Sequence, residues 1–194
     1  MSIQTLEDLY IDQLQDLYSA NRQSLKVTEK LAGKAHNPKL QDALKRGVSG
    51  IEDGINAVEG LIRKHKADPR GEFCQGMEGL VKEAKAHAID AEIEDEDVRD
   101  ASIISQYQRM THYALAGYGT VLAFARRLGF KDDAEVLAGT DPNNPNSKPA
   151  ETIAQIRDDY DAHTPVATES SIGKIAENLI GKRAKALFLL IILF

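Results

Sequence analysis

Apolar residues recur every three or four positions in two long runs within residues 1–65. This spacing matches the helical repeat and predicts two amphipathic helices. Thr5 followed by Asp8 has the pattern of a capping box, so the first helix is predicted to begin there. Asn37 and Pro38 separate the two helices, since Asn caps helices and Pro fits their first turn. The predicted core-facing positions are Leu6, Tyr10, Leu14, Leu17, Asn21, Leu25, Thr28 and Leu31 in the first helix, and Leu40, Leu44, Val48, Ile51, Ile55, Val58 and Ile62 in the second.

A shorter helix and a third long helix follow along the chain. The shorter helix is predicted over residues 74–91, and the acidic residues 92–97 are expected to be a solvated connection. The third long helix is predicted over residues 98–128, because helical spacing continues up to Gly129, a residue that favours the end of a helix. Its predicted core-facing positions are Ile104, Gln108, Thr111, Leu115, Tyr118 and Leu122.

The fourth helix is predicted to be interrupted by an insertion. Residues 132–138 can begin it, but residues 139–149 are rich in Gly, Asp, Asn and Pro and are predicted to form a loop. Helical spacing returns near Ile153 and stops near Pro165, whose ring disfavours a helix interior. Long helices joined by short loops, with a helical crossover between the second and third long helices, predict an all-α, ferritin-like up-down four-helix bundle over residues 1–178.

The last residues differ in character from the bundle. Residues 179–194 combine a basic stretch with an uninterrupted apolar run over residues 186–194. The apolar run is too short to span a bilayer, which takes about 20 residues. Three interpretations of this tail remain open: it docks on the bundle or on another subunit, it makes a peripheral contact with an anionic membrane surface, or it is a non-native end.

The composition narrows the class of protein. With 194 residues, 42% hydrophobic and 28% charged, the chain is typical of one soluble globular domain. A net charge of −6, with no basic stripe along a helix, argues against nucleic acid as a partner. Cys74 is the only cysteine, so an intrachain disulfide is impossible and a reducing cytoplasm is the expected compartment. The N-terminal residues have neither a basic region nor an apolar run, so no secretory signal is predicted.

Three blocks of the sequence resemble a known family. Residues 106–120 read QYQRMTHYALAGYGT, residues 74–80 read CQGMEGL, and residues 98–101 read VRDA. These blocks are similar to the YciF-type ferritin-like family of bacterial proteins, which is associated with stress. The resemblance covers residues 3–138 well and residues 150–178 loosely. It implies a ferritin-like bundle in a cytoplasmic homodimer.

Ferritin-like bundles with two metal ions use one Glu on each of two helices and a Glu-x-x-His pair on each of the other two. No Glu-x-x-His sequence occurs in this chain. The resemblance places the ligand positions at Asn21 in the first helix, at Ser49 and Glu52 in the second, and at Thr111 and Ala114 in the third. In the interrupted fourth helix, the corresponding positions are Gln155, Asp158 and Asp161.

These substitutions favour a bundle that has lost the dinuclear centre. Asn21, Gln108 and Thr111 would then form a neutral, hydrogen-bonded layer, because buried polar groups need partners. No cofactor is expected in such a bundle. The corresponding function is that of a non-enzymatic structural or protective protein associated with stress.

A reduced metal site is the alternative interpretation. Glu52, His112 and Asp161 would hold iron or manganese with an atypical set of ligands, because three ligands are enough for a single ion. The protein would then have an oxidoreductase or iron-handling role. Two further histidines, His36 and His65, lie at predicted helix ends and are expected to face water.

Overall fold

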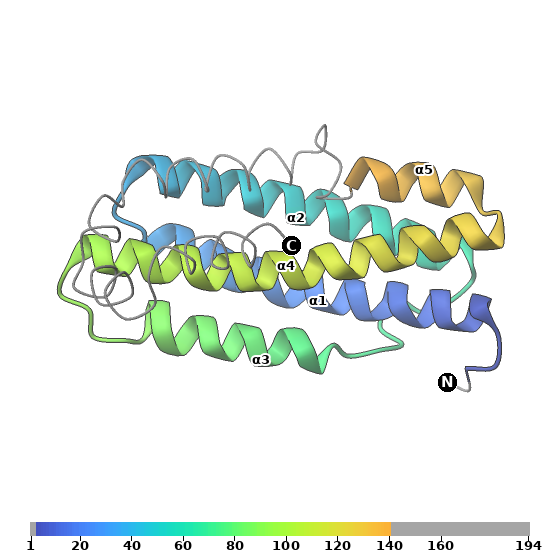
Figure 1. The fold of residues 1–194 in the computed structure, drawn as a ribbon, viewed down its shortest axis with the longest axis horizontal. Coiled ribbons are helices and arrows are strands. Elements are labelled where there is room, and N and C mark those ends of the chain that lie inside the picture. The colour runs from blue at the N-terminus through green and yellow to red at the C-terminus, as the bar shows by residue number, and fades with distance from the viewer. Residues whose placement is uncertain (1–2, 141–194) are drawn as a thin grey trace, which may run out of the picture. The chain divides into compact units, whose positions relative to one another are not determined.

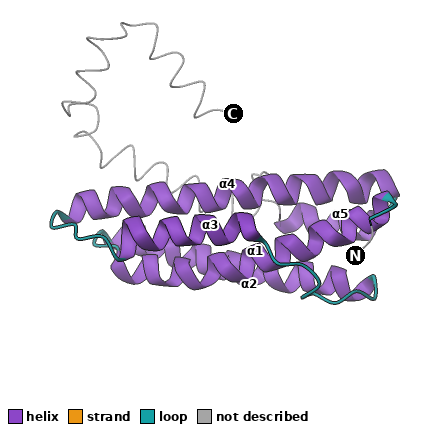
Figure 2. Cartoon of the chain, turned by 90° about the horizontal axis from the view of Figure 1, so that it is seen from below, coloured by secondary structure: helices purple, strands orange, loops and turns teal. Residues whose placement is uncertain are grey.

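The computed structural model describes residues 3–140, which form helices joined by short loops (Figures 1 and 2). No strand occurs within this range, which confirms the predicted all-α class. The helices are α1 (Leu6–Lys34), α2 (Pro38–Lys64), α3 (Gln75–Ala84), α4 (Glu96–Leu128) and α5 (Lys131–Thr140), and a π-helical turn, η1 (Lys85–Ile89), extends α3.

The helices have the order and directions of a ferritin-like bundle. α1 and α2 are antiparallel neighbours, and α3 runs back along the bundle so that α4 is parallel to α2 (Figure 1). α1 packs against α2, α3 and α4, while α5 turns back along α4 and also contacts α2. The predicted crossover between the second and third long helices is therefore confirmed.

Local hydrogen bonds fix the ends of the long helices as predicted. The Thr5 hydroxyl accepts from the backbone N–H of Asp8 at 3.0 Å, and the Asp8 carboxylate accepts from the backbone N–H of Thr5 at 2.9 Å. Asn37 caps α2 immediately before Pro38. α4 ends at Gly129, whose φ of 77° is a left-handed conformation that glycine adopts without steric cost.

Two boundaries differ slightly from the prediction. α4 begins two residues early, because the Asp95 carboxylate accepts from the backbone N–H groups of Asp97 and Val98 at 2.9 and 3.1 Å and caps the helix. The acidic connection is thus partly helical, as negative charge favours a helix N-terminus. α5 continues to Thr140, so the predicted loop starts later, and residues 141–149 lie outside the described residues.

Two clusters of buried apolar side chains fill the space around α1. The polar residues Asn21 and Ser24 are buried along α1 among the residues of the first cluster, between Ala20 and Val27. Burying a large aliphatic side chain contributes about 1.5–3 kcal/mol, so these clusters supply most of the packing energy. The first cluster contains Leu31, Leu44, Met77 and Ile103, and the second contains Tyr10, Leu14, Ile62 and Leu137.

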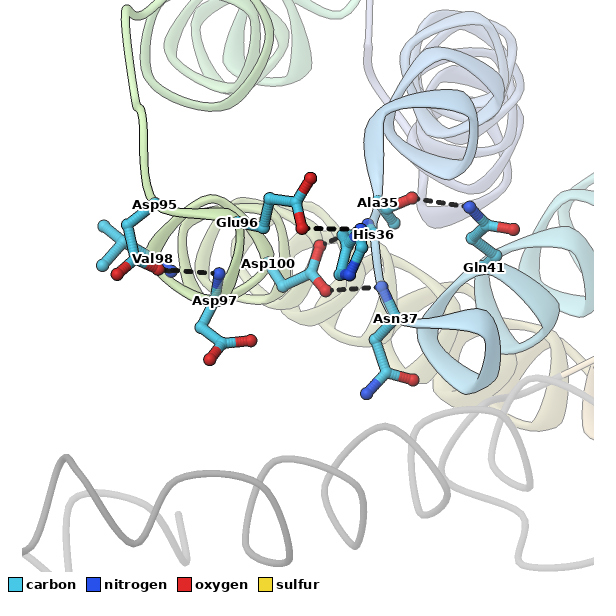
Figure 3. A network of polar contacts seen from close by, with 9 residues as sticks. All are labelled: Ala35, His36, Asn37, Gln41, Asp95, Glu96, Asp97, Val98 and Asp100. Carbon is cyan, nitrogen blue, oxygen red and sulfur yellow. Dashed lines mark hydrogen bonds and ion pairs between the residues drawn. The ribbon is translucent and has the colours of Figure 1, made fainter.

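A buried carboxylate joins the start of α4 to the turn between α1 and α2 (Figure 3). Asp100 is 7% exposed and accepts from the backbone N–H groups of His36 and Asn37, both at 2.8 Å. At the surface, His36 Nδ1 lies 3.0 Å from Glu96 Oε2. Backbone donors at a helix start lack partners within the helix, and Asp100 satisfies two donors next to the start of α2. The sequence block at residues 98–101 therefore has a structural role.

We expect Asp100→Ala to lower the free energy of unfolding by about 2–3 kcal/mol, because it leaves two backbone N–H groups without their charged acceptor. Urea denaturation at pH 7 measures this change. Asp97→Ala is the matched control, since Asp97 is exposed on the same turn of α4 and should cost less than about 0.5 kcal/mol. Equal effects of the two substitutions would contradict the role given to Asp100.

None of the helices within residues 3–140 is both long and apolar enough to cross a bilayer. The later predictions, on the interrupted fourth helix over residues 150–178 and on the tail over residues 179–194, lie outside the described residues. The three interpretations of the tail therefore stay open.

Candidate functional site

A cavity of about 50 Å³ lies in the middle of the bundle between α1, α2 and α4. Three predicted ligand positions line it: Asn21, which is 3% exposed, and the half-buried Thr111 and Ala114. The structure thus brings together the positions from the first and third helices. The other polar residues of the lining are Ser24, Thr28, Tyr107 and Tyr118.

Within residues 3–140, the side-chain hydrogen bonds described here around the cavity join neutral groups. Asn21 Nδ2 donates to the Tyr118 hydroxyl at 2.9 Å. Two hydroxyls of α1 donate to backbone carbonyls one turn earlier: Ser24 to Asn21 at 3.0 Å, and Thr28 to Ser24 at 2.8 Å. The Thr111 hydroxyl likewise donates to a backbone carbonyl of α4, at 2.9 Å. All of these groups are uncharged at neutral pH.

Two tyrosines of α4 approach α2 at glycine residues. A Cβ atom added at Gly47 would lie 2.4 Å from the Tyr107 hydroxyl oxygen, and one added at Gly54 would lie 2.4 Å from that of Tyr118. Only glycine allows such a close approach without a shift of the ring. Burial raises the pKa of Tyr107 to about 12, although the neighbouring Thr111 hydroxyl lowers it. The Tyr107 phenol is therefore protonated at pH 7.

The predicted register of α4 is wrong by one residue at this level. Gln108 and Leu115 were expected to face the core, but both are only half-buried. Tyr107 and Met110 are buried instead, with 6% and 2% exposure. Gly47 makes room for the Tyr107 ring, and the periodicity of α4 alone carries no information about that space. The neutral layer therefore contains a tyrosine in place of Gln108.

The other candidate ligands lie away from the cavity or outside the described residues. Ser49 and Glu52 are exposed on α2, and His112 is exposed on α4. Asp161 falls in the part of the chain that the structure does not describe. Within residues 3–140, no group of three or more His, Cys, Asp or Glu side chains is placed to hold a metal ion.

The donors around the cavity do not fit a pair of iron or manganese ions. Such ions prefer carboxylate and imidazole ligands, whose charge and basicity balance the metal charge. Within residues 3–140, the cavity offers an amide, hydroxyls and phenols. Its volume of about 50 Å³ suits about two water molecules. The arrangement can hold neutral hydrogen-bonding groups, but it lacks the negative charge that two cations need.

Substitution of Gly54 tests the packing of this layer. We expect Gly54→Ala to lower the free energy of unfolding by about 1–3 kcal/mol, because the new Cβ overlaps the Tyr118 hydroxyl and displaces it from Asn21. Gly60→Ala is the matched control on α2: nothing lies within 4 Å of its added Cβ, so it should stabilise by about 0.5–1 kcal/mol. Urea denaturation compares them, and a neutral Gly54→Ala would contradict this geometry.

A second polar cluster joins the end of α2 to α5 and was not predicted. The buried Asp133 carboxylate accepts from the Tyr10 hydroxyl at 2.9 Å and from Lys64 Nζ at 2.6 Å, and lies 2.7 Å from His65 Nε2. The His65 ring packs against the rings of Tyr10 and Phe130, with centroid distances of 5.6 and 4.9 Å. The expectation that His65 faces water is wrong, since its side chain is only 12% exposed.

Hydrogen bonds keep the Asp133 carboxylate ionised despite its burial. Burial alone would raise the pKa of Asp133, but hydrogen bonds from Lys64, His65 and Tyr10 together hold it below its usual range. Burial, together with the hydrogen bond to Asp133, raises the pKa of Tyr10. Both oxygens of Asp133 are already engaged by protein groups, so the cluster fastens helices and is not available as a ligand site.

Cys74 occupies the start of α3, as predicted for a small residue at a helix start. Its backbone N–H donates to the Ser19 hydroxyl at 3.0 Å, and its Sγ lies 3.0 Å from the Tyr113 hydroxyl. Sγ also accepts from the backbone N–H of Met77 at 3.4 Å and so caps the helix. Burial raises the pKa of the thiol, which favours a structural role over a reactive one.

Comparison with known proteins agrees with the fold and with the motifs. The family described as "Domain of unknown function (DUF892)" matches residues 5–146. Protein YciF of Escherichia coli K12 is 32% identical over 141 residues, which cover 72% of this chain and 84% of YciF.

Two solved structures are also similar. The crystal structure of the E. coli stress protein YciF matches with a TM-score of 0.74 and 29% identity, covering 83% of this chain and 98% of that one. YcfI of Rhodopseudomonas palustris, for which a structural role has been suggested, matches with a TM-score of 0.71 and 31% identity, covering 80% and 95% of the two chains. The fold, the sequence blocks and these relatives together show that the chain belongs to the YciF-type ferritin-like family, DUF892.

Proposed function

We propose that this protein is a non-enzymatic structural or protective bundle, associated with stress, that has lost the dinuclear metal centre of ferritin-like proteins. The similarity to a stress protein and to a protein with a suggested structural role supports the biological part of the proposal. The observation that carries the chemical part is the neutral lining of the central cavity, where Asn21 and Thr111 stand at ligand positions.

The chemistry of the lining supports the loss of the centre. Amide and hydroxyl oxygens are weak ligands for iron and manganese unless anionic ligands accompany them. A tyrosine can supply negative charge only by losing its proton, and burial raises the pKa of Tyr107 to about 12. To serve as an anionic ligand for two buried cations, Tyr107 would have to lose its proton against this raised pKa. The exposed Glu52 and His112 remain in water, where they need no metal to balance them.

Titration with metal ions tests the proposal. Fe(II) and Mn(II) are added anaerobically to the full-length protein, and the midpoint of thermal unfolding is followed. A ligand that binds only the native state at about 100 times its Kd would stabilise it by about 2.7 kcal/mol, so a real site would give a clear rise. We expect no saturable rise. A rise that disappears in Glu52→Ala or His112→Ala would instead establish the alternative, an iron- or manganese-binding protein with an oxidoreductase or iron-handling role.

We further propose a homodimer in the cytoplasm, as the family resemblance implies. The single buried thiol of Cys74 suits a reducing compartment, and the net charge of −6 argues against nucleic acid as a partner. Sedimentation equilibrium of the full chain should give twice the mass of one chain. A monomer at micromolar concentration would contradict the dimer without affecting the argument about metal.

A further inference from the structure

Asn21 carries an unpaired hydrogen-bonding atom inside the cavity. Its amide nitrogen donates to the Tyr118 hydroxyl, but its carbonyl oxygen, Oδ1, has no hydrogen-bond partner among residues 3–140. The side chain is only 3% exposed and lines the cavity. Buried amide oxygens nearly always have a partner, and ordered water supplies it where protein groups do not. This oxygen therefore indicates a bound molecule.

The size and charge of the cavity restrict what that molecule can be. About 50 Å³ accommodates about two water molecules and excludes most organic metabolites. The lining side chains within residues 3–140 are neutral, so they offer a small ion no counter-charge. The lining also offers both hydrogen-bond acceptors and a donor. The hydroxyls of Ser24, Thr28 and Thr111 donate to backbone carbonyls, so their oxygens still have lone pairs that can accept. The protonated Tyr107 phenol can donate.

The cavity also lies close to solvent on one side. Ile51 of α2 and Thr111 and Ala114 of α4 line it and are only half-buried, in contrast to the buried lining residues of α1.

We propose that the central cavity is a binding site for water, held as a hydrogen-bonded pair that donates to Asn21 Oδ1 and accepts from the Tyr107 hydroxyl. This water pair lies beside Asn21 and Thr111, two of the predicted ligand positions. The inference rests on the proposed loss of the metal centre, because ions in the same cavity would displace the water. The proposed water gives the cavity a ligand and explains why polar side chains line it.

A high-resolution crystal structure of the full-length protein is the first test. We expect difference density for one or two waters at hydrogen-bond distance from Asn21 Oδ1. A cavity that is dry, or filled by a side chain, overturns the water site but leaves the proposed function intact. Two ions bridged by protein ligands at about 2.0–2.2 Å overturn both the water site and the proposed function.

Nuclear magnetic resonance in solution provides the second test, with variants. Cross-relaxation peaks between long-lived water and the Asn21 side-chain amide or the Thr111 methyl group are expected in the wild type. Thr111→Val keeps the shape of the side chain and its methyl groups and should retain the water peak at Asn21. Asn21→Leu should lose the water peak at residue 111. Gly60→Ala adds a Cβ atom with nothing within 4 Å of it, and this variant should retain both peaks. Water peaks that persist unchanged in Asn21→Leu, or that are absent from the wild type, contradict the site.

Discussion

Asp133→Ala is expected to lower the free energy of unfolding by about 3 kcal/mol at pH 7. The change removes the acceptor shared by Tyr10, Lys64 and His65 and leaves the buried Tyr10 hydroxyl without a partner. Lys64 is half-exposed and returns to water, which limits the loss. Urea denaturation followed by circular dichroism measures the difference.

Asp132→Ala is the control for this experiment. Asp132 lies next to Asp133, is 89% exposed and contacts Lys64 only at 3.6 Å. Exposed ion pairs of this kind contribute about 0–1 kcal/mol, so the control should remain close to the wild type. If both variants lose the same stability, the net negative charge of the α5 N-terminus matters and the buried contacts of Asp133 do not.

The same carboxylate predicts a dependence on pH. The pKa of Asp133 is lower in the folded protein than its usual value, so its contribution is fully present above about pH 4. It is lost as the pH falls through the lower folded value, because protonation removes the charged acceptor. The stability difference between the wild type and Asp133→Ala should therefore shrink as the pH falls from about 4 toward 2. A difference that grows on acidification would contradict this assignment.

Asn21→Asp is expected to lower the free energy of unfolding by about 2–4 kcal/mol at pH 7. The substitution keeps the shape of the side chain but places a carboxylate in a cavity whose lining within residues 3–140 has no cation. Burial disfavours the charged form and should raise the pKa of the new carboxyl group above its usual value. Asn56→Asp, on the exposed side of α2, is the control and should change stability by less than about 0.5 kcal/mol.

The pH dependence of Asn21→Asp has the opposite sign to that of Asp133. For a raised folded pKa, the cost is full above that value and disappears as the pH falls below about 4, where the group becomes protonated in both states. The variant should therefore approach the wild type in acid. A bundle that held metal ions would behave differently: the added carboxylate would be a better ligand than the amide, and metal would stabilise the variant more than the wild type.

Most of the helix ends could be predicted because their causes are local. The capping box of Thr5 and Asp8, the Asn37–Pro38 pair and Gly129 act through hydrogen bonds or backbone conformations within a few residues. The short loops and the helical crossover extended the prediction to the direction of each helix. These features needed no knowledge of which side chains meet across the bundle.

The composition of the cavity and the second polar cluster could be predicted only in part. Asn21 and Thr111 line one cavity, but the replacement of Gln108 by Tyr107 depends on Gly47, a residue on another helix. Asp133 and His65 are 68 positions apart, and a helix-end histidine looks solvent-exposed until its partner is known. Periodicity reports which face of a helix is buried, but it does not report which residue lies opposite.

The metal content of the full-length protein, purified from cells supplemented with iron and manganese, tests the central claim most directly. The neutral cavity predicts only trace amounts of both metals, with the same trace in Glu52→Ala. Two iron or manganese ions per chain, or near-stoichiometric metal that Glu52→Ala removes, would contradict the account.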